Sequence, residues 1–452
     1  MPTITNKTIE ELQAGATASA TRILQAADAR AWANAFGDIS LSAGSDQGQA
    51  PAGILSSLFA ALVGSTLPGP GSTIRSLSLD VKTALPIGAG ITTTVTVRDI
   101  QSAEKTVTLD AQATADGQEL ATGTIVVAAP TSSVKADVAD HRLEGLLERC
   151  KGLKPIPTAI VHPLSADAIE GALDAAAAGL IVPVLFGPEA EIRKIAGDAG
   201  LNLSSCKIVP TKSEEDSAAK AAQAAGNGEV AALMKGSLHT DVLLHAMMQK
   251  ENNLRTGRLL SHVALVSIPT YARRVVVTDV ALNIAPDTDQ KRDICQNAIG
   301  FAIAMGVVEP KVAILAAVEM VRTRMAATTD AAILSKMADR KQIVGGIVDG
   351  PLDLDAAVDA GAAKIKHITS PVAGTADVLL VPNIEAGNMI YKNLVFMADS
   401  QTAGLVVGAR VPVMLTSRAD TAAARRYSAA AAVLYAHALV QNSTAILPAT
   451  AD

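Results

Sequence analysis

Aromatic residues are scarce in this chain: Phe, Trp and Tyr make up only 2% of its 452 residues. Platforms for stacking nucleic-acid bases are therefore not expected. Basic residues are also too few and too scattered to bind a polyanion. The 38 Lys and Arg are outnumbered by 44 Asp and Glu, and the net charge is −6. The composition argues against nucleic acid as a partner.

Cysteine is nearly absent as well. The three cysteines, Cys150, Cys206 and Cys295, lie far apart without a CxxC pair, which predicts a reducing compartment, no disulfides and no zinc site. The first residues, MPTITNKTIEELQAG, are polar where a signal peptide needs an apolar core. No apolar run is long enough to cross a bilayer. We expect a cytoplasmic protein with no membrane partner.

Several catalytic motifs are missing. The seven histidines show no HExxH and no other metal-ligand spacing, so we assign no metal site. No GxSxG occurs, which argues against an α/β-hydrolase. No GxGxxG follows a strand-like run, which argues against a Rossmann dinucleotide enzyme.

The first 130 residues predict a small α+β domain. One helical run, ADARAWANAF, and the apolar segment PAGILSSLFAALVGSTLPGPG precede four alternating segments: IRSLSLDVKT, AGITTTVTVRDIQ, KTVTLDAQATA and ELATGTIVVAAP. Alternation of apolar and polar residues between Gly and Asp turns indicates an antiparallel sheet with one buried face. The polar residues 131–140 are predicted as a linker.

Residues 141–452 predict an α/β domain with mostly parallel sheets. Runs rich in Val, Ile and Leu, such as PTAIVHP, IVPVLFGP and ADVLLVPN, alternate with helical segments. Runs without alternation indicate strands buried on both faces, as in parallel sheets. Ligands bind outside the carboxyl ends of such strands, where the following helix offers free N–H groups to anions. Polar residues at strand ends are therefore the first functional candidates.

Ser417 and Arg418 directly follow the strand-like run VPVML. Asp420 or Thr421 can act as the N-cap of the next helix. An Arg at that place opposes the helix dipole unless an anion is bound there too. Because a guanidinium binds phosphate through two parallel hydrogen bonds, we predict that Ser417 and Arg418 face an anionic ligand.

Three more segments carry polar side chains next to strands. LMKGSLHTD places Lys235 beside a Gly, although ordinary turn chemistry also explains this segment. NNLRTGRLLSHV carries Arg255, Arg258, Ser261 and His262 just before an apolar strand, and a basic loop is the alternative interpretation. VPNIEAGNMIYK carries Asn388 and Lys392, for which a solvated helix face is the alternative.

Seven segments then occur in a fixed order: ALMKGSLHTDVLLHA, RTGRLLSHVALV, TDVALNIAPDTDQK, AILSKMADR, GGIVDGPLDLDAAV, SPVAGTADVLLVPNIEAGNMIYKNL and VPVMLTSRADT. Together they closely resemble the phosphate acetyl/butyryltransferase family over about residues 141–450, with the butyryl-type members nearer. The resemblance implies transfer of an acyl group between coenzyme A and inorganic phosphate. It implies two α/β subdomains around a cleft, at about 141–268 plus 405–452 and at 269–404, and usually a dimer. Coenzyme A is then a substrate, and no cofactor is permanently bound.

The resemblance also assigns residues. The family's Ser–Arg pair matches Ser417 and Arg418, which become the predicted catalytic residues. An Asp that acts as a base in acetyl-type members is replaced here by Ala424. His245 stands where those members have a substrate-binding Arg, and Arg255 and Arg258 are candidates to supply the missing charge. The predicted substrate-binding residues are Lys235, His245, Arg255, Arg258, Ser261, Asn283, Asn388 and Lys392.

Residues 10–128 resemble the MaoC-like hot-dog domain of (R)-specific enoyl-CoA hydratases through AFGD, PAGILSSLFAALVGSTLPGPGS and LPIGAGITTTVTV. Asp38 is kept from the hydratase motif, but Ala43 and Ala52 stand where histidines are expected. Because hydration needs an acid–base pair, we expect little or no hydratase activity from this domain. Pairing of subunits is the other role open to it.

The sequence as a whole therefore predicts a phosphate acyltransferase with a degenerate hot-dog domain. One alternative is a bifunctional enzyme that also hydrates enoyl-CoA. Another is a non-catalytic, coenzyme A-binding regulatory protein, which Ala424 favours and the intact Ser417–Arg418 pair disfavours. The acyl chain length, the oligomer size and the base that receives the thiol proton stay open.

Overall fold

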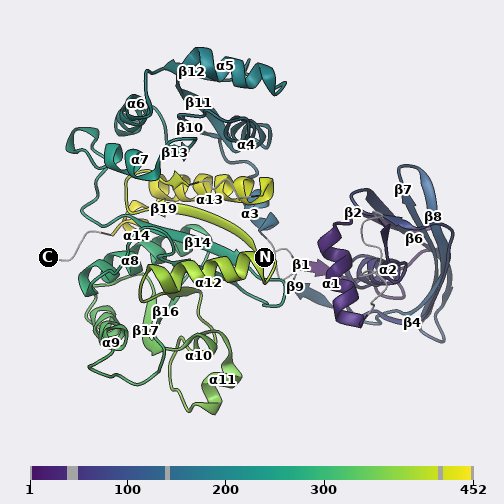
Figure 1. The fold of residues 1–452 in the computed structure, drawn as a ribbon. Helices are drawn as coiled ribbons and strands as arrows, with labels where there is room; N and C mark the ends of the chain where they lie inside the picture. Colours follow the sequence, from purple (N-terminus) through teal and green to yellow (C-terminus); the bar gives the residue numbers. More distant parts are fainter. Residues whose placement is uncertain (1–2, 38–48, 138–142, 416–420, 449–452) are drawn as a thin grey trace. The chain divides into compact units, whose positions relative to one another are not determined.

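The computed structural model describes residues 3–37, 49–137, 143–415 and 421–448 (Figure 1). The chain forms two compact units, Met1–Ala139 and Asp140–Asp452. Each unit is built around buried hydrophobic clusters of its own residues.

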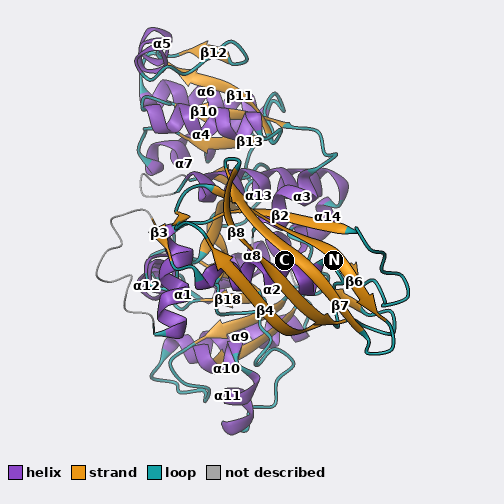
Figure 2. Cartoon of the chain, turned by 90° about the vertical axis from the view of Figure 1, so that its right-hand side faces the viewer, coloured by secondary structure: helices purple, strands orange, loops and turns teal. Residues whose placement is uncertain are grey.

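The first unit is a five-stranded antiparallel sheet with a central helix. The strand order is β2-β6-β7-β8-β4, and the strands are β2 (Thr17–Ile23), β4 (Thr73–Val81), β6 (Gly90–Gln101), β7 (Thr106–Ala115) and β8 (Gln118–Ala128). Figure 2 shows β4, β8, β7 and β6 side by side. Helix α2 (Gly53–Ser65) buries Leu55, Phe59 and Leu62 in the same core as the inward Val and Leu residues of the strands. The predicted α+β hot-dog architecture is confirmed.

Smaller elements complete this unit. Helix α1 (Ala26–Phe36) forms at the predicted helical run. The sequence did not predict the two short antiparallel pairs, β3 (Gln49–Ala50) with β5 (Leu85–Pro86) and β1 (Thr3–Thr5) with β9 (Lys135–Asp137). β9 lies inside the predicted linker 131–140. Its backbone groups pair with β1, so a polar composition did not exclude a strand there.

The second unit contains one eleven-stranded sheet of order β12-β11-β10-β13-β20-β19-β14-β15-β18-β16-β17. Its strands are β10 (Ile156–Val161), β11 (Ile181–Gly187), β12 (Lys207–Pro210), β13 (Ala232–Lys235), β14 (Ser261–Ser267), β15 (Arg274–Thr278), β16 (Lys311–Leu315), β17 (Ile347–Leu352), β18 (Val378–Leu380), β19 (Gln401–Val407) and β20 (Val413–Met414).

This sheet has two parallel blocks joined by an antiparallel centre. The five strands from β12 to β20 are parallel neighbours, as are the four from β15 to β17. Between the blocks, β19 and β14 pair antiparallel with each other and with their outer neighbours. The mostly parallel character is confirmed. The antiparallel centre was not predicted, because its strands are as apolar and as buried as the parallel ones.

Helices cover both faces of the sheet, which explains the unbroken apolar runs. On β10 the side chain of Ile160 belongs to one buried cluster, whereas Ala159 and Val161 belong to the cluster on the opposite face. The first face packs against α3 (Glu144–Cys150), α4 (Ala166–Ala177), α5 (Glu189–Asp198), α8 (Thr288–Ala304), α9 (Ala326–Asp339), α13 (Ala422–Gln441) and α14 (Ser443–Ile446). The opposite face of the sheet packs against α6 (Glu214–Gly226), α7 (Thr240–Met247), α10 (Leu354–Val358) and α12 (Ile384–Phe396). Two short helices, η3 (Lys250–Asn252) and α11 (Ala360–Ile365), lie in the connections.

The cysteine side chains of the second unit are buried or partly buried. The cysteines are unpaired, and burial raises the pKa of Cys150 to about 11 and that of Cys295 to about 12. These two thiols are therefore protonated and unreactive at neutral pH.

Among the helices of the described ranges, none is long and apolar enough to cross a membrane.

Candidate active site

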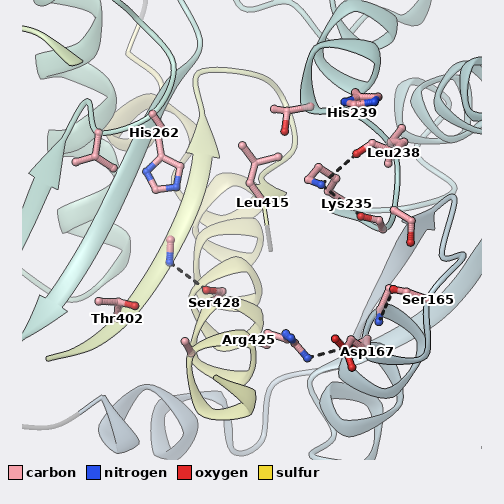
Figure 3. A pocket seen from close by; sticks show the side chains of 18 of the residues that line it. Ser165, Asp167, Lys235, Leu238, His239, His262, Thr402, Leu415, Arg425 and Ser428 are labelled. Atoms are coloured by element: carbon pink, nitrogen blue, oxygen red, sulfur yellow. Dashed lines mark hydrogen bonds between the residues drawn. The ribbon is translucent and has the colours of Figure 1, made fainter. Parts of the chain in front are cut away.

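The second unit contains a cavity of about 800 Å³ at the carboxyl ends of its first parallel block. One part of its wall comes from the segments that follow β10, β13 and β20. The other part comes from β14, β19, α12, the segment after β15 and Ser428 of α13. Figure 3 shows the two parts facing each other, with Lys235 and Ser165 opposite His262 and Ser428. The position agrees with the rule that open α/β sheets bind ligands at the carboxyl ends of their strands.

Three helices begin at this cavity. The N-terminal residues of α4, α7 and α13 contribute Asp167 and Ala168, Thr240, and Ala424 and Arg425 to the wall. Ser165 caps α4 by accepting a hydrogen bond from the Ala168 amide at 3.3 Å. Free N–H groups and the positive dipole end make each helix start favourable for an anion.

Basic side chains add to this positive potential. Lys235 stands at the end of β13, where its Nζ donates to the Leu238 carbonyl at 3.1 Å. Arg425 donates to the Asp167 carbonyl at 3.4 Å, and Lys392 lies on the α12 side. Asp167 is the carboxylate that the described wall contributes. The cavity is therefore suited to a ligand with negative charge.

Gly236 allows the β13 end to pass close to β10. A Cβ at this position would lie 2.5 Å from the Val161 carbonyl oxygen and 2.6 Å from that of His162. The Gly236 and Ser237 amides donate to those same oxygens at 2.9 and 2.8 Å. This close approach fixes Lys235 and Ser237 at the cavity wall.

Replacing Gly236 by Ala is expected to lower the free energy of unfolding by about 1–3 kcal/mol, as overpacking typically does. Activity should fall with it, because the displaced turn carries Lys235. Urea unfolding and turnover measure the two effects. Gly197→Ala is the matched control, since nothing lies within 4 Å of a Cβ on that helical residue. Equal stability of Gly236→Ala and the wild type would contradict the packing argument.

The other wall is built around β14 and β19. His262 projects from β14 into the cavity, with 7% of the residue exposed. Ser428 of α13 accepts a hydrogen bond from the Gly404 amide of β19 at 3.0 Å. Tyr391 of α12 donates to the Thr402 hydroxyl at 3.4 Å. These bonds hold α12 and α13 against the centre of the sheet at the cavity.

The structure brings three of the predicted substrate-binding residues to this cavity. Lys235, Asn388 and Lys392 all line it. Ser417 and Arg418 lie outside the described residues, but Leu415 and Ala424 on either side of that segment line the cavity too.

The other five predicted residues do not line this cavity. Arg255 donates to the Met248 carbonyl and Arg258 is buried with a bond to the Pro448 carbonyl. His245 is exposed on α7, with a ring nitrogen 2.8 Å from Gln249 Nε2. Ser261 accepts from Asn297 at 3.0 Å. Asn283 donates to Asp279 at 2.6 Å and to the Leu260 carbonyl at 2.9 Å.

Sequence reasoning missed part of the wall. Ser165 and Asp167 follow β10 in the segment VHPLSADAIE, where the same strand-end argument could have selected them. His262 was assigned to a loop before a strand, whereas it is the second residue of β14. Arg425, Ser428 and Thr402 gave no signal, because they lie inside a helix or a strand rather than at a strand end.

The fold and the cavity define an α/β protein with a site suited to an anion where its parallel strands end. A family model described as phosphate acetyl/butaryl transferase matches residues 211–433. A phosphate acetyltransferase of Rhizobium meliloti is 47% identical over 295 residues, which are 65% of this chain and 93% of that protein. The chain belongs to the phosphate acetyl/butyryltransferase family, as the sequence motifs predicted.

Relatives of both names match. A phosphate butyryltransferase of Clostridium acetobutylicum is 40% identical over 64% of this chain and 95% of that protein. The crystal structure of a branched-chain phosphotransacylase from Enterococcus faecalis V583 has a TM-score of 0.56 and 29% identity, covering 62% of this chain and 99% of that one. Because acetyl-type and butyryl-type relatives both match, the comparisons do not identify the acyl group. The preferred acyl group and the closer resemblance to butyryl-type members therefore stay predictions.

Proposed function

We propose that this chain transfers an acyl group between coenzyme A and inorganic phosphate through the cavity of its second unit. Family membership supports this reaction. The observation that carries it is the convergence of three helix N-termini with Lys235, Lys392 and Arg425 around one cavity. Both the acyl phosphate and the phosphate groups of coenzyme A are anions that such a site attracts.

The chemistry needs neither a metal nor a covalent intermediate on the protein. The thiol sulfur attacks the acyl-phosphate carbonyl carbon, and phosphate leaves. Catalysis then rests on holding the two substrates together and stabilising the charge on the carbonyl oxygen and the phosphate. We assign the phosphate contact to Arg418 and a hydrogen-bond donor role to Ser417. Coenzyme A is a substrate in this proposal, and no permanent cofactor is invoked.

We also propose a homodimer in the cytoplasm. Met389, Phe396 and Met397 are 70%, 66% and 80% exposed along α12 and its end. Exposed apolar side chains at this spacing favour contact with another protein surface. The unpaired cysteines support a reducing compartment. Light scattering of the full chain during size-exclusion chromatography tests the dimer.

The test of the reaction is thioester formation from coenzyme A and acetyl, propionyl or butyryl phosphate, followed by ultraviolet absorbance. We expect turnover with at least one acyl phosphate, and the ranking identifies the acyl group. The same preparation should not hydrate crotonyl-CoA, because Ala43 and Ala52 replace the expected histidines. Folded protein without turnover on any acyl phosphate would instead support a coenzyme A-binding regulatory protein.

A further inference from the structure

His262 is a buried nitrogen base in the cavity wall that the reaction above leaves without a role. The residue is 7% exposed and lines the cavity. Its Nδ1 atom has no hydrogen-bond partner among the residues that the structure describes. A buried polar nitrogen without a partner loses its hydration without compensation, so its retention calls for a functional reason.

The surroundings keep this ring neutral yet able to take up a proton. Burial lowers the pKa of His262, because an imidazolium is poorly solvated there, and the negative charge of Asp279 acts in the opposite direction. The Asp279 carboxylate is held in place by the Ala281 and Leu282 amides, at 3.0 and 3.1 Å. A neutral imidazole offers a lone pair at pH 7. Asp279 then stabilises the cation that forms when the ring binds a proton.

Other charged groups also face the cavity, and they suit this task less well. Lysine and arginine side chains carry their protons already and cannot accept another. Asp167 and His239 are exposed on the opposite wall, where water competes for them. The charged and titratable residues of the described wall are Asp167, Lys235, His239, His262, Tyr391, Lys392 and Arg425.

The backbone beside His262 is shaped to fit its ring. A Cβ on Gly404 would lie 3.1 Å from both Cε1 and Nε2 of His262. The Gly404 amide donates to Ser428, which lies one helical turn after Ala424 on the α13 wall. Figure 3 shows His262 and Ser428 on the same side of the cavity. Gly404 thus leaves room for the edge of the His262 ring beside Ser428, in the wall of the cavity where the reaction is proposed.

We propose that His262 accepts the proton of the coenzyme A thiol as the sulfur attacks the acyl phosphate. The S–H proton passes to a ring nitrogen while the new S–C bond forms. The C–O bond to phosphate breaks, and its electron pair leaves with the phosphate. In the opposite direction the imidazolium returns this proton to the departing thiolate. This role rests on the proposed function and makes His262 a general base in one direction and a general acid in the other.

The experiment compares the pH dependence of turnover in the wild type and His262→Gln, in the full chain. At pH 7 we expect kcat to fall about 10²–10⁴-fold, the usual contribution of a general base. The loss should shrink as the pH rises to about 8.5 and above, toward the range in which a thiol ionises without help. KM for the acyl phosphate should stay close to the wild-type value. His437→Gln is the control, since that ring bonds to the Lys154 carbonyl elsewhere on α13.

A second variant tests the same role without removing the histidine. Gly404→Ala adds a methyl group against the ring edge and should lower kcat at pH 7 by about 10-fold, with the same recovery at high pH. If His262→Gln does not fold, the pH dependence of Gly404→Ala still tests whether His262 accepts the proton. A loss of equal size at every pH, or near wild-type turnover at pH 7, would overturn the proposal. An inactive wild type would instead refute the proposed function.

Discussion

Arg418→Ala is expected to lower the turnover of coenzyme A with an acyl phosphate by about 10²–10³-fold, the usual result of removing one preorganised donor from a charge-stabilising site. The reason is that the leaving phosphate carries negative charge, which a guanidinium neutralises through two parallel hydrogen bonds. Steady-state kinetics at saturating acyl phosphate measure the loss in kcat.

Two further variants make this result specific. Arg418→Lys keeps the charge but not the planar fork, so its turnover should fall between those of the wild type and Arg418→Ala. Arg426→Ala removes an exposed Arg near the start of α13, and this residue is not among the described residues that line the cavity. That control should leave turnover unchanged. Near wild-type activity of Arg418→Ala would refute the assigned role.

Lys291→Met is expected to destabilise the second unit by about 3–5 kcal/mol, because it leaves a buried carboxylate without its cation. Lys291 Nζ lies 2.6 Å from Asp330 Oδ2, and the two side chains are only 6% and 13% exposed. Thr288 donates to the other carboxylate oxygen at 2.5 Å. The pair joins α8 to α9, and urea unfolding of the variant measures its contribution.

The chain offers a matched comparison for this ion pair. Lys336 and Asp339 are 2.5 Å apart on α9, but their side chains are 67% and 63% exposed. Lys336→Met should therefore change the free energy of unfolding by no more than about 1 kcal/mol. Similar losses in both variants would mean that burial does not determine the strength of the Lys291–Asp330 pair.

The two sheet types could be predicted from the sequence because burial leaves a pattern. The alternation in β6 and β7 indicated one buried face, and the apolar runs of β10 and β11 indicated two. Strand direction leaves no such pattern. β14 and β15 pair antiparallel through the short connection 268–273, and nothing in their composition distinguishes them from parallel neighbours. β9 and β1 are too short for any periodicity to appear.

Cavity residues were predictable where polar side chains follow a strand directly or lie in the helix after it, as Asn388 and Lys392 of α12 do. Lys235 met that condition. His262 did not, since it lies inside the buried strand β14, where a polar residue simply interrupts the apolar run. Arg255 and Arg258 were predicted from their charge, but they do not line this cavity. A guanidinium binds a carbonyl as readily as a phosphate, and here both donate to backbone carbonyls, a choice that only the tertiary structure reveals.

The strand order also has a consequence for synthesis of the chain. β20 is inserted between β13 and β19, so the first parallel block is completed only after residues 401–414 have been synthesised, later than every other strand of the sheet. The antiparallel unit, in contrast, has all its strands within residues 3–137. A chain that stalls before residue 401 would have all the strands of the first unit but would lack β19 and β20 of the second, which leaves β13 and β14 as open edges. Such edges invite pairing between chains, so premature termination should produce aggregates rather than a partly active fragment.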